Sequence, residues 1–444
     1  MDWGPHWLVE VEYPFDLQEA CSHAAAMSQA IPRYFLRQVR LSRFKAVSNE
    51  QQISLSPLSV LIGRNGSGKS TLIESLQWID AALRGDANAA CDRYRGIRDL
   101  LNKKSGGGSF SIRLTWSADE QERTESQVNS PQTPVEYSVE VSESARVAGI
   151  AHEHLSHGGK DWIKTEPWWA TRISTSAPPR TGPTREFNGR VITFPDADRI
   201  RLASPDRLAL DLVPKAADET WPVFPLVMVR HFFRDAVFLR LSPKSLSQPA
   251  RVLRSSNDPI LDEEGATLPA LLLELNEAQR VEVVAQLQQV LPDVCGLGVS
   301  APGESDLPVY YHLLEALSAP DAAMTKAMLP SWMLSEGTRR LTALFALLAR
   351  DPPPSLLCIE EIENGLDPWT VVAVLDALRS ATARGVQVLI TTHSPWFLDH
   401  VRLDEIIRVR RVAGETHYER FVDDAEVRAF RDGVPPGLRY VRAE

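Results

Sequence analysis

Hydrophobic and polar positions divide the chain into two ordered stretches, separated by a long region with a weaker pattern. Residues 34 to 43 alternate in character, and a polar turn leads to a continuous apolar run from Leu58 to Ile62. This order predicts two antiparallel strands that lead into a buried strand. After a Gly-rich loop, a helix that ends near Gly85 is predicted by four apolar residues on one face: Leu72, Ile73, Leu76 and Ile79.

The second ordered stretch begins after Trp332. A helix opened by Ser335 is predicted by apolar residues at helical spacing, namely Leu341, Leu344, Phe345 and Leu348. An apolar strand before Glu360, a helix starting at Pro368 and a β-branched run ending in "LITT" follow, and then a hairpin. Strands that alternate with helices predict an α/β fold with a largely parallel central sheet.

The middle region has a weaker pattern. Residues 118 to 190 are rich in Ser, Thr, Pro and Trp and lack sustained helical periodicity, which predicts short strands and long loops. Residues 268 to 292 hold two apolar-periodic helical segments. No heptad pattern persists between residues 70 and 330, so a long coiled-coil arm is excluded.

Composition and charge then limit the class of protein. The chain has 444 residues, a formal net charge of -10 and four scattered cysteines without a C-x-x-C pair. The negative net charge argues against a protein that coats nucleic acid with its whole surface. The cysteine pattern fits a reducing compartment. With neither a secretory signal nor an apolar run long enough for a bilayer, we expect a cytoplasmic protein without membrane contact.

The Gly-rich loop carries the strongest chemical signal. "GRNGSGKS" has the spacing G-x-x-x-x-G-K-[ST], and it lies between a buried strand and a helix. In such a loop the main-chain N–H groups converge on phosphate oxygens, the lysine reaches the β- and γ-phosphates, and the serine hydroxyl binds Mg²⁺. The expected nucleotide-binding residues are Gly63, Arg64, Asn65, Gly66, Ser67, Gly68, Lys69, Ser70 and Thr71, with Ser70 also at the metal.

Two carboxylates follow the apolar strand that precedes residue 360. In P-loop proteins such a strand lies near the one that feeds the loop and carries its acids to the metal. We therefore expect Glu360 at the Mg²⁺ shell, through water, and Glu361 as the general base that polarises the attacking water. The alternative, an exposed loop in which the charges are simply solvated, is weakened by the presence of the Gly-rich loop.

Further motifs carry a resemblance to a family. The order of the Gly-rich loop, "LSEG", "IEEIENGLDP" and "LITTHSP" resembles the head of ABC-type ATPases, in the SMC/RecF/OLD-like branch. The resemblance covers roughly residues 31 to 116 and 225 to 412. It implies a P-loop NTPase fold with an antiparallel β subdomain and an inserted middle region.

This resemblance suggests a division of the chain into six segments. They are an N-terminal extension (1–30), an N-terminal lobe with the P-loop (31–116), an insertion (117–224), a helical and basic lid (225–325), a C-terminal lobe (326–415) and a tail (416–444).

The resemblance also assigns roles. Ser335 and Gly337 would face the γ-phosphate of an ATP held by another protomer, in an ATP-bridged homodimer or higher oligomer. Asp367 would cross the dimer interface, although Asp367 and Ser335 are also ordinary helix N-caps. His393 would contact the γ-phosphate or the attacking water, joining Lys69 and Glu361 as catalytic residues. ATP and Mg²⁺ are the implied substrate and metal.

Departures from the family pattern matter as well. Glu360 stands where many ABC enzymes have Asp, and "LSEG" lacks the second glycine and glutamine, which argues against a transporter subunit. Gln77 is a candidate for the metal-sensing residue only by position, and a surface role is the better interpretation. The histidines of "HEHLSH" are expected in a polar loop rather than at a metal.

Several functions remain open at this point. The leading hypothesis is an ATPase that acts as the sensor of a bacterial anti-phage defence system and controls a separate effector protein. The alternative is a RecF-like DNA-binding ATPase of DNA maintenance. Too few residues follow His393 for the metal-binding TOPRIM domain of an OLD-type nuclease. A degenerate module without hydrolysis is disfavoured because every catalytic position is occupied.

Possible contacts with DNA rest on two basic tracts. One holds Arg33, Arg37, Arg40, Arg43 and Lys45; the other holds Arg234, Arg240, Lys244, Arg251 and Arg254. A solvated strand face is the more usual explanation of such tracts.

Overall fold

The computed structural model describes twelve parts of the chain. They are residues 34–118, 133–165, 171–173, 185–187, 190–192, 199–200, 204–212, 224–250, 258–300, 308–317, 325–430 and 433–443. The expected extension at residues 1–30 lies outside these ranges, as do Arg33, Arg251 and Arg254.

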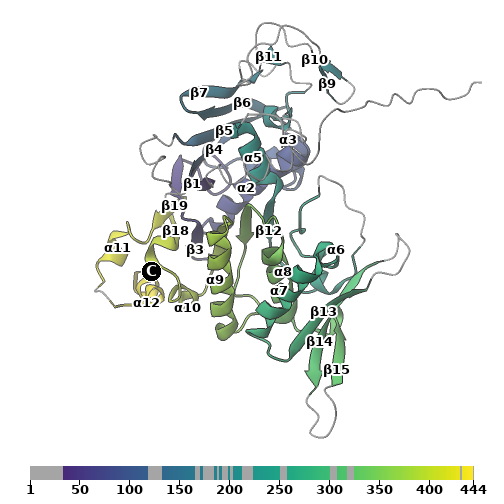
Figure 1. The fold of residues 1–444 in the computed structure, drawn as a ribbon. Helices are drawn as coiled ribbons and strands as arrows, with labels where there is room; N and C mark the ends of the chain where they lie inside the picture. Colours follow the sequence, from purple (N-terminus) through teal and green to yellow (C-terminus); the bar gives the residue numbers. More distant parts are fainter. Residues whose placement is uncertain are drawn as a thin grey trace, which may run out of the picture.

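A six-stranded sheet forms the centre of the molecule (Figure 1). Its strands run in the order β12 (Ala236–Leu239), β16 (Leu356–Ile359), β17 (Gln387–Thr392), β3 (Leu58–Ile62), β18 (Ile406–Val412) and β19 (Glu415–Arg420). The first five are parallel to their neighbours, and β19 returns antiparallel to β18. This confirms the α/β fold with a mostly parallel central sheet. Because the carboxyl ends of these strands share one edge, Gly63, Glu360 and His393 all follow strands at that edge.

Side chains of the parallel strands alternate between two hydrophobic cores. Leu356 and Cys358 of β16 join the core that contains α2 (Lys69–Arg84). Leu357 and Ile359 join the core that contains α8 (Glu336–Ala349) and α9 (Pro368–Ala383). Helices therefore cover both faces of the sheet, which explains why the strand before Glu360 reads as an uninterrupted apolar run.

An eight-stranded antiparallel sheet packs over α2, on the side away from α8 (Figure 1). Its order is β11 (Arg199–Ile200), β8 (Thr171–Ile173), β7 (Lys160–Thr165), β6 (Val147–His157), β5 (Val135–Ser144), β4 (Ser109–Ala118), β1 (Tyr34–Ser42) and β2 (Gln51–Ser54). The inner face of this sheet shares its core with α2, α3 (Ala87–Asp92) and α5 (Phe224–Arg234).

The prediction of short strands and long loops after residue 117 was wrong for β5 and β6. These strands have 10 and 11 residues, and they extend the sheet begun by β1 and β4. Buried and more exposed side chains alternate along most of β5, so "VEYSVEVSES" has the period-2 pattern of a half-buried strand. The expected polar loop at "HEHLSH" is part of β6, and the described residues contain no cluster of His, Cys, Asp and Glu suited to a metal.

The remaining elements surround the two main sheets. The two helices expected at residues 268–292 are present as α6 (Leu268–Glu274) and α7 (Glu277–Gln288), next to a sheet of β13 (Val294–Ser300), β14 (Tyr310–Leu317) and β15 (Thr325–Pro330). The short elements are α4 (Ile97–Leu100), β9 (Arg185–Phe187), β10 (Arg190–Ile192), α10 (Pro395–Leu398), α11 (Ala425–Arg428) and α12 (Pro436–Ala443). The described residues also form four 3₁₀ turns: η2 (Ala209–Leu212), η3 (Ser245–Ser247), η4 (Ser331–Met333) and η5 (Leu403–Glu405). In the described parts of the chain, every helix is too short or too polar to cross a lipid bilayer.

Candidate functional site

The Gly-rich loop connects β3 to α2, and close packing fixes its glycines. Gly68 has φ of 112°, and a Cβ there would lie 2.7 Å from the Thr416 methyl carbon. A Cβ on Gly63 would lie 2.1 Å from the main-chain oxygen of Val409. The hairpin of β18 and β19 therefore leaves no room for a side chain at Gly63 or Gly68. Arg64 and Asn65 are exposed at the tip of the loop, whereas Thr71 is buried.

The same hairpin holds the loop by hydrogen bonds. The Thr416 hydroxyl donates to the main-chain oxygen of Ser67 at 2.9 Å, and the Tyr418 hydroxyl donates to that of Gly68 at 2.7 Å. Because the carbonyl oxygens of Ser67 and Gly68 accept hydrogen bonds from β19, the hairpin fixes the path of the loop on the side opposite its N–H groups. Sequence reasoning missed Thr416 and Tyr418 because no local pattern in β19 points to a residue some 350 positions earlier.

Lys69 folds back onto the loop that precedes it. Its Nζ donates to the oxygens of Gly63 at 2.7 Å and Arg64 at 3.1 Å, and lies 3.4 Å from Nδ1 of His393. Burial lowers the pKa of Lys69, and the negative charges of Glu361 and its neighbours oppose that effect. The ammonium group is thus held by two carbonyl oxygens that a phosphate could replace.

Ser70 and Glu360 meet as the sequence predicts. The Ser70 hydroxyl donates a 2.6 Å hydrogen bond to Oε2 of Glu360. A hydroxyl beside a carboxylate is an oxygen donor set that suits Mg²⁺. The hydroxyl of Ser67 is buried in the loop and has no hydrogen-bond partner among the described residues. A Mg²⁺–triphosphate group therefore fits these residues: Ser70 and Glu360 would hold the metal, and Ser67 could donate to a phosphate.

Glu361 has a backbone conformation that is unusual for a residue with a side chain. Its φ is 50°, and its N–H donates to the Thr391 hydroxyl at 2.9 Å. One carboxylate oxygen accepts from Asn364 at 2.7 Å, and the other lies 3.9 Å from Nε2 of His393. Left-handed backbone at a carboxylate residue is a common feature of functional sites. The structure thus brings together the three expected catalytic residues, Lys69, Glu361 and His393.

Glu363 is a further residue of the site, and sequence reasoning gave it no role. Its Oε1 accepts a 2.6 Å hydrogen bond from the main-chain N–H of His393. Its Oε2 is buried and has no hydrogen-bond partner within the described ranges. Glu363 therefore ties the loop after β16 to the loop after β17.

Ser335, Gly337 and Asp367 form a second cluster at the N-termini of α8 and α9. Ser335 caps α8 by accepting from the N–H of Thr338 at 3.1 Å, and Asp367 caps α9 by accepting from that of Thr370 at 3.0 Å. A Cβ on Gly337 would lie 2.5 Å from the oxygen of Gly365, so the two loops touch. The helix-cap interpretations are confirmed for Ser335 and Asp367.

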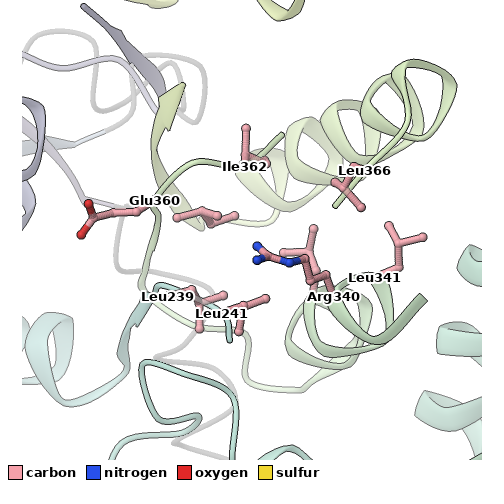
Figure 2. Close-up of a pocket in the computed structure, with 9 residues that line it drawn as sticks. Leu239, Leu241, Arg340, Leu341, Glu360, Ile362 and Leu366 are labelled. Atoms are coloured by element: carbon pink, nitrogen blue, oxygen red, sulfur yellow. The ribbon is translucent and has the colours of Figure 1, made fainter. Parts of the chain in front are cut away.

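The helix that begins this second cluster packs against other elements than the helix after the P-loop does. The helix α8 packs against α6, α7 and α9, whereas α2 packs against α3, α5, β12 and β17. An apolar pocket lies between the ends of β12 and β16 and one side of α8. Figure 2 shows the carboxylate of Glu360 turned away from this pocket and the guanidinium of Arg340 inside it. Glu360 thus serves the P-loop, while Arg340 of α8 pairs with Glu336 at 3.0 Å.

The expectation that Gln77 is a surface residue was wrong. Its side chain is 6% exposed, and its amide nitrogen donates to Glu263 at 3.1 Å. Glu263 also pairs with Arg93 at 2.9 Å. Gln77 therefore connects α2 to the segment that follows β12.

Two protein-family models match separate parts of the chain. One, described as "AAA domain, putative AbiEii toxin, Type IV TA system", matches residues 325–399. The other, described as an AAA domain, matches residues 38–160. The first contains the acidic strand end and His393, and the second contains the P-loop.

A curated protein and solved structures are also similar to this chain. The energy-coupling factor transporter ATP-binding protein EcfA2 of Mycoplasmopsis synoviae (strain 53) is 40% identical over 68 residues, which is 15% of this chain. This chain spans only 20% of the length of that protein. The crystal structure of an SMC head bound to the C-winged helix domain of ScpA has a TM-score of 0.52 at 15% identity, covering 87% of this chain and 97% of that one. An SMC head from Pyrococcus furiosus, bound to the C-terminal domain of ScpA, has a TM-score of 0.48 at 13% identity, with 87% of this chain and 96% of that chain covered.

Proposed function

We propose that this chain is an SMC/ABC-like P-loop ATPase that hydrolyses ATP to ADP and phosphate, which is supported by its two AAA-domain matches and by its likeness in fold to an SMC head. The observation that carries this proposal is the 2.6 Å hydrogen bond between Ser70 and Glu360, next to the pair of Glu361 and His393. The separate elements that bear these residues converge on the loop where the nucleotide phosphates would bind.

Each residue has a definite task in this reaction. The loop from Gly63 to Ser70 and the N-terminus of α2 bind the phosphates, and Lys69 exchanges its carbonyl partners for phosphate oxygens. Bound Mg²⁺ would neutralise phosphate charge, held by Ser70 and Glu360. Glu361 orients a water molecule and accepts its proton as the water oxygen bonds to the γ-phosphorus and the bond to ADP breaks.

His393 is in position to hold the attacked phosphate or the water. Its two ring nitrogens face Lys69 at 3.4 Å and Glu361 at 3.9 Å. The imidazole can therefore donate a hydrogen bond at the point where the new charge develops.

The second cluster supports a paired mechanism. Ser335 and Gly337 begin α8, whose N-terminus suits an anion, but α8 and α2 belong to different groups of packed elements. We therefore assign Ser335, Gly337 and Asp367 to an ATP held by a second copy of the chain. Binding of two ATP molecules then closes a homodimer and hydrolysis opens it, so the enzyme works as a switch.

For the biological role we propose control of a separate effector in bacterial anti-phage defence. The toxin–antitoxin wording of the family model over residues 325–399 supports this role. The SMC head solved with part of ScpA gives a precedent for a head that binds a separate protein. A RecF-like role in DNA maintenance is the alternative, and stimulation of the ATPase by duplex DNA, without an effector, would favour it.

Two inactive variants test the paired mechanism. Lys69→Ala disables the P-loop and Ser335→Arg disables the second cluster, so each variant alone should be inactive. When the two are mixed, about half of the dimers are mixed and each has one intact composite site, so roughly a quarter of wild-type ATP turnover should return. A mixture that stays inactive, although light scattering shows mixed dimers, would refute the paired mechanism.

Glu361→Gln tests the general base in the same assay. Loss of turnover with retained ATP binding and a larger molar mass in ATP is the expected result. Unchanged turnover in this variant would remove Glu361 from the mechanism.

A further inference from the structure

The edge strand β12 also ends at the carboxyl edge of the central sheet, and the residue after it is Arg240. The register pairs Leu239 of β12 with Ile359 of β16, the last residue before Glu360. The main-chain N–H of Glu360 donates to the oxygen of Leu239 at 2.9 Å, so the pairing continues one step beyond the strands. Neighbouring strands lie about 4.8 Å apart, and Arg240 therefore stands directly beside Glu360.

Arg240 and Glu360 belong to the same side of the sheet. In β12, Phe238 joins the core that contains α2, whereas Leu239 joins the core that contains α8. Successive side chains of a strand alternate between faces, so Arg240 continues on the side of α2. The position of Leu241 agrees with this, because it lines the apolar pocket beside α8 together with Leu239. Figure 2 shows the carboxylate of Glu360 turned away from that same pocket.

A second segment of the chain fixes the backbone of Arg240 from its other side. The main-chain N–H of Arg240 donates to the oxygen of Glu263 at 2.8 Å, and that of Ser242 donates to the oxygen of Glu264 at 3.0 Å. The side chain of Glu263 in turn accepts a 3.1 Å hydrogen bond from Gln77 of α2. Arg240 is thus held between β16 and a segment that is itself connected to the helix after the P-loop.

The guanidinium of Arg240 is exposed, and among the described residues it has no hydrogen-bond or ion-pair partner. The nearby carboxylates are engaged elsewhere: Glu360 accepts from Ser70 at 2.6 Å. Glu74 of α2 pairs with Lys45 at 2.5 Å. Burial raises the pKa of Glu74, and the charges of Lys45 and Arg240 oppose that shift, so the cation acts on the side of α2. The fold therefore keeps a cation without a carboxylate partner next to the residue expected at Mg²⁺.

We propose that Arg240 binds the γ-phosphate of ATP and is a further phosphate-binding residue of the site; this inference rests on the proposed ATPase function. In the central sheet, β16 and β17 separate β12 from β3, so Arg240 and the P-loop lie on opposite sides of Glu360 and His393. The P-loop encloses the inner phosphates, and a cation beyond Glu360 therefore meets the terminal phosphate. A guanidinium suits this place because its planar fork of N–H donors fits phosphate oxygens and does not bind a metal.

Equilibrium binding of two fluorescent nucleotides with Mg²⁺ tests the proposal. One is ADP, and the other is a non-hydrolysable ATP analogue with an imido group between the β- and γ-phosphates. Arg240→Ala removes the guanidinium, and Arg240→Lys keeps the charge without the planar fork. Lys244→Ala removes an exposed cation of the same segment and is the matched control.

We expect Arg240→Ala to bind the ATP analogue at least about tenfold more weakly than the wild type, and ADP with an affinity within about twofold. Arg240→Lys should recover part of the loss, and Lys244→Ala should bind both nucleotides as the wild type does. Thermal unfolding of Arg240→Ala without nucleotide should match the wild type, since the guanidinium has no partner among the described residues. An equal change for ATP analogue and ADP, or no change for either, would overturn the proposal.

Turnover of ATP by the same proteins distinguishes failure of this proposal from failure of the proposed function. A wild type that binds the analogue without hydrolysing ATP would remove the ATPase, while the two affinities would still decide the role of Arg240. If the wild type hydrolyses ATP, kcat of Arg240→Ala should fall about a hundredfold, because a donor to the developing phosphate charge is lost. Normal kcat and normal affinities in this variant would leave the ATPase intact and refute the role of Arg240. Absence of analogue binding to the wild type would overturn both proposals.

Discussion

The main-chain N–H of His393 donates a 2.6 Å hydrogen bond to the carboxylate of Glu363. This bond joins the loops after two neighbouring strands, so the position of His393 depends on a residue outside the expected catalytic set. Glu363→Ala should therefore lower kcat about tenfold with little change in ATP affinity, because a positioned group is lost while the phosphate loop is intact.

Glu363→Gln keeps an oxygen acceptor and should restore most of this activity. Steady-state kinetics and binding of a fluorescent ATP analogue measure the two effects separately. An equal loss of activity in both variants would contradict a positioning role.

Stability and activity should conflict at Glu361. Its φ of 50° favours glycine, and Glu360 and Glu363 lie close in the chain. Glu361→Gly should relieve the backbone strain at this position and raise the free energy of unfolding by about 1 kcal/mol. This figure already subtracts the larger chain entropy of glycine in the unfolded state. The same variant should have no ATP turnover. Denaturant melts measure the gain. Ala413→Gly, at a residue that also has φ of 50°, is the control for the backbone effect alone.

The contact between β19 and the P-loop should affect nucleotide binding. Thr416→Val retains the shape of the side chain but leaves the buried oxygen of Ser67 without its 2.9 Å donor. We expect ATP to bind about fivefold more weakly, because the loss of this hydrogen bond costs the ordered loop roughly 1 kcal/mol. Thr342→Val removes a similar buried bond, 2.8 Å to Thr338 in α8, and should leave ATP affinity unchanged. Equal affinities in the two variants would contradict a special role for Thr416.

A buried carboxylate in the antiparallel sheet predicts a dependence of stability on pH. Glu153 accepts hydrogen bonds from Tyr137 and from the N–H groups of Ala209 and Leu210 at the start of η2. Burial raises the pKa of Glu153 from 4.5 to about 7, although these donors oppose the shift. Because the folded state holds the proton more tightly, the stabilisation from protonation is complete below pH 4.5 and is lost as pH rises to about 7.

Glu153→Gln removes this titration. Between pH 5 and pH 8, the wild type should lose roughly 2 to 3 kcal/mol of unfolding free energy relative to the variant. Urea melts across this range provide the test, and a constant difference would contradict the raised pKa.

Much of the fold could be predicted because local patterns decide it. The loop from Gly63 to Ser70 and the strand before Glu360 have patterns that only a few structures satisfy, and the structure places them side by side. The strand β5 was not predicted because its polar positions are Ser and Glu and it lies in a polar region. The composition of that region indicated loops more strongly than the alternation indicated a strand. The contacts of Thr416, Tyr418 and Glu363 could not be predicted, since each depends on which strands become neighbours in the sheet.

The contact between β19 and the P-loop also has a consequence for synthesis of the protein. A ribosome makes the P-loop first, and Thr416 and Tyr418 are added some 350 residues later. At typical elongation rates of about 5 to 20 residues per second, this leaves an interval of tens of seconds. During that interval the nascent chain carries the nucleotide motif without the hairpin that fixes its shape, so the phosphate-binding loop is completed only after β19 has been made.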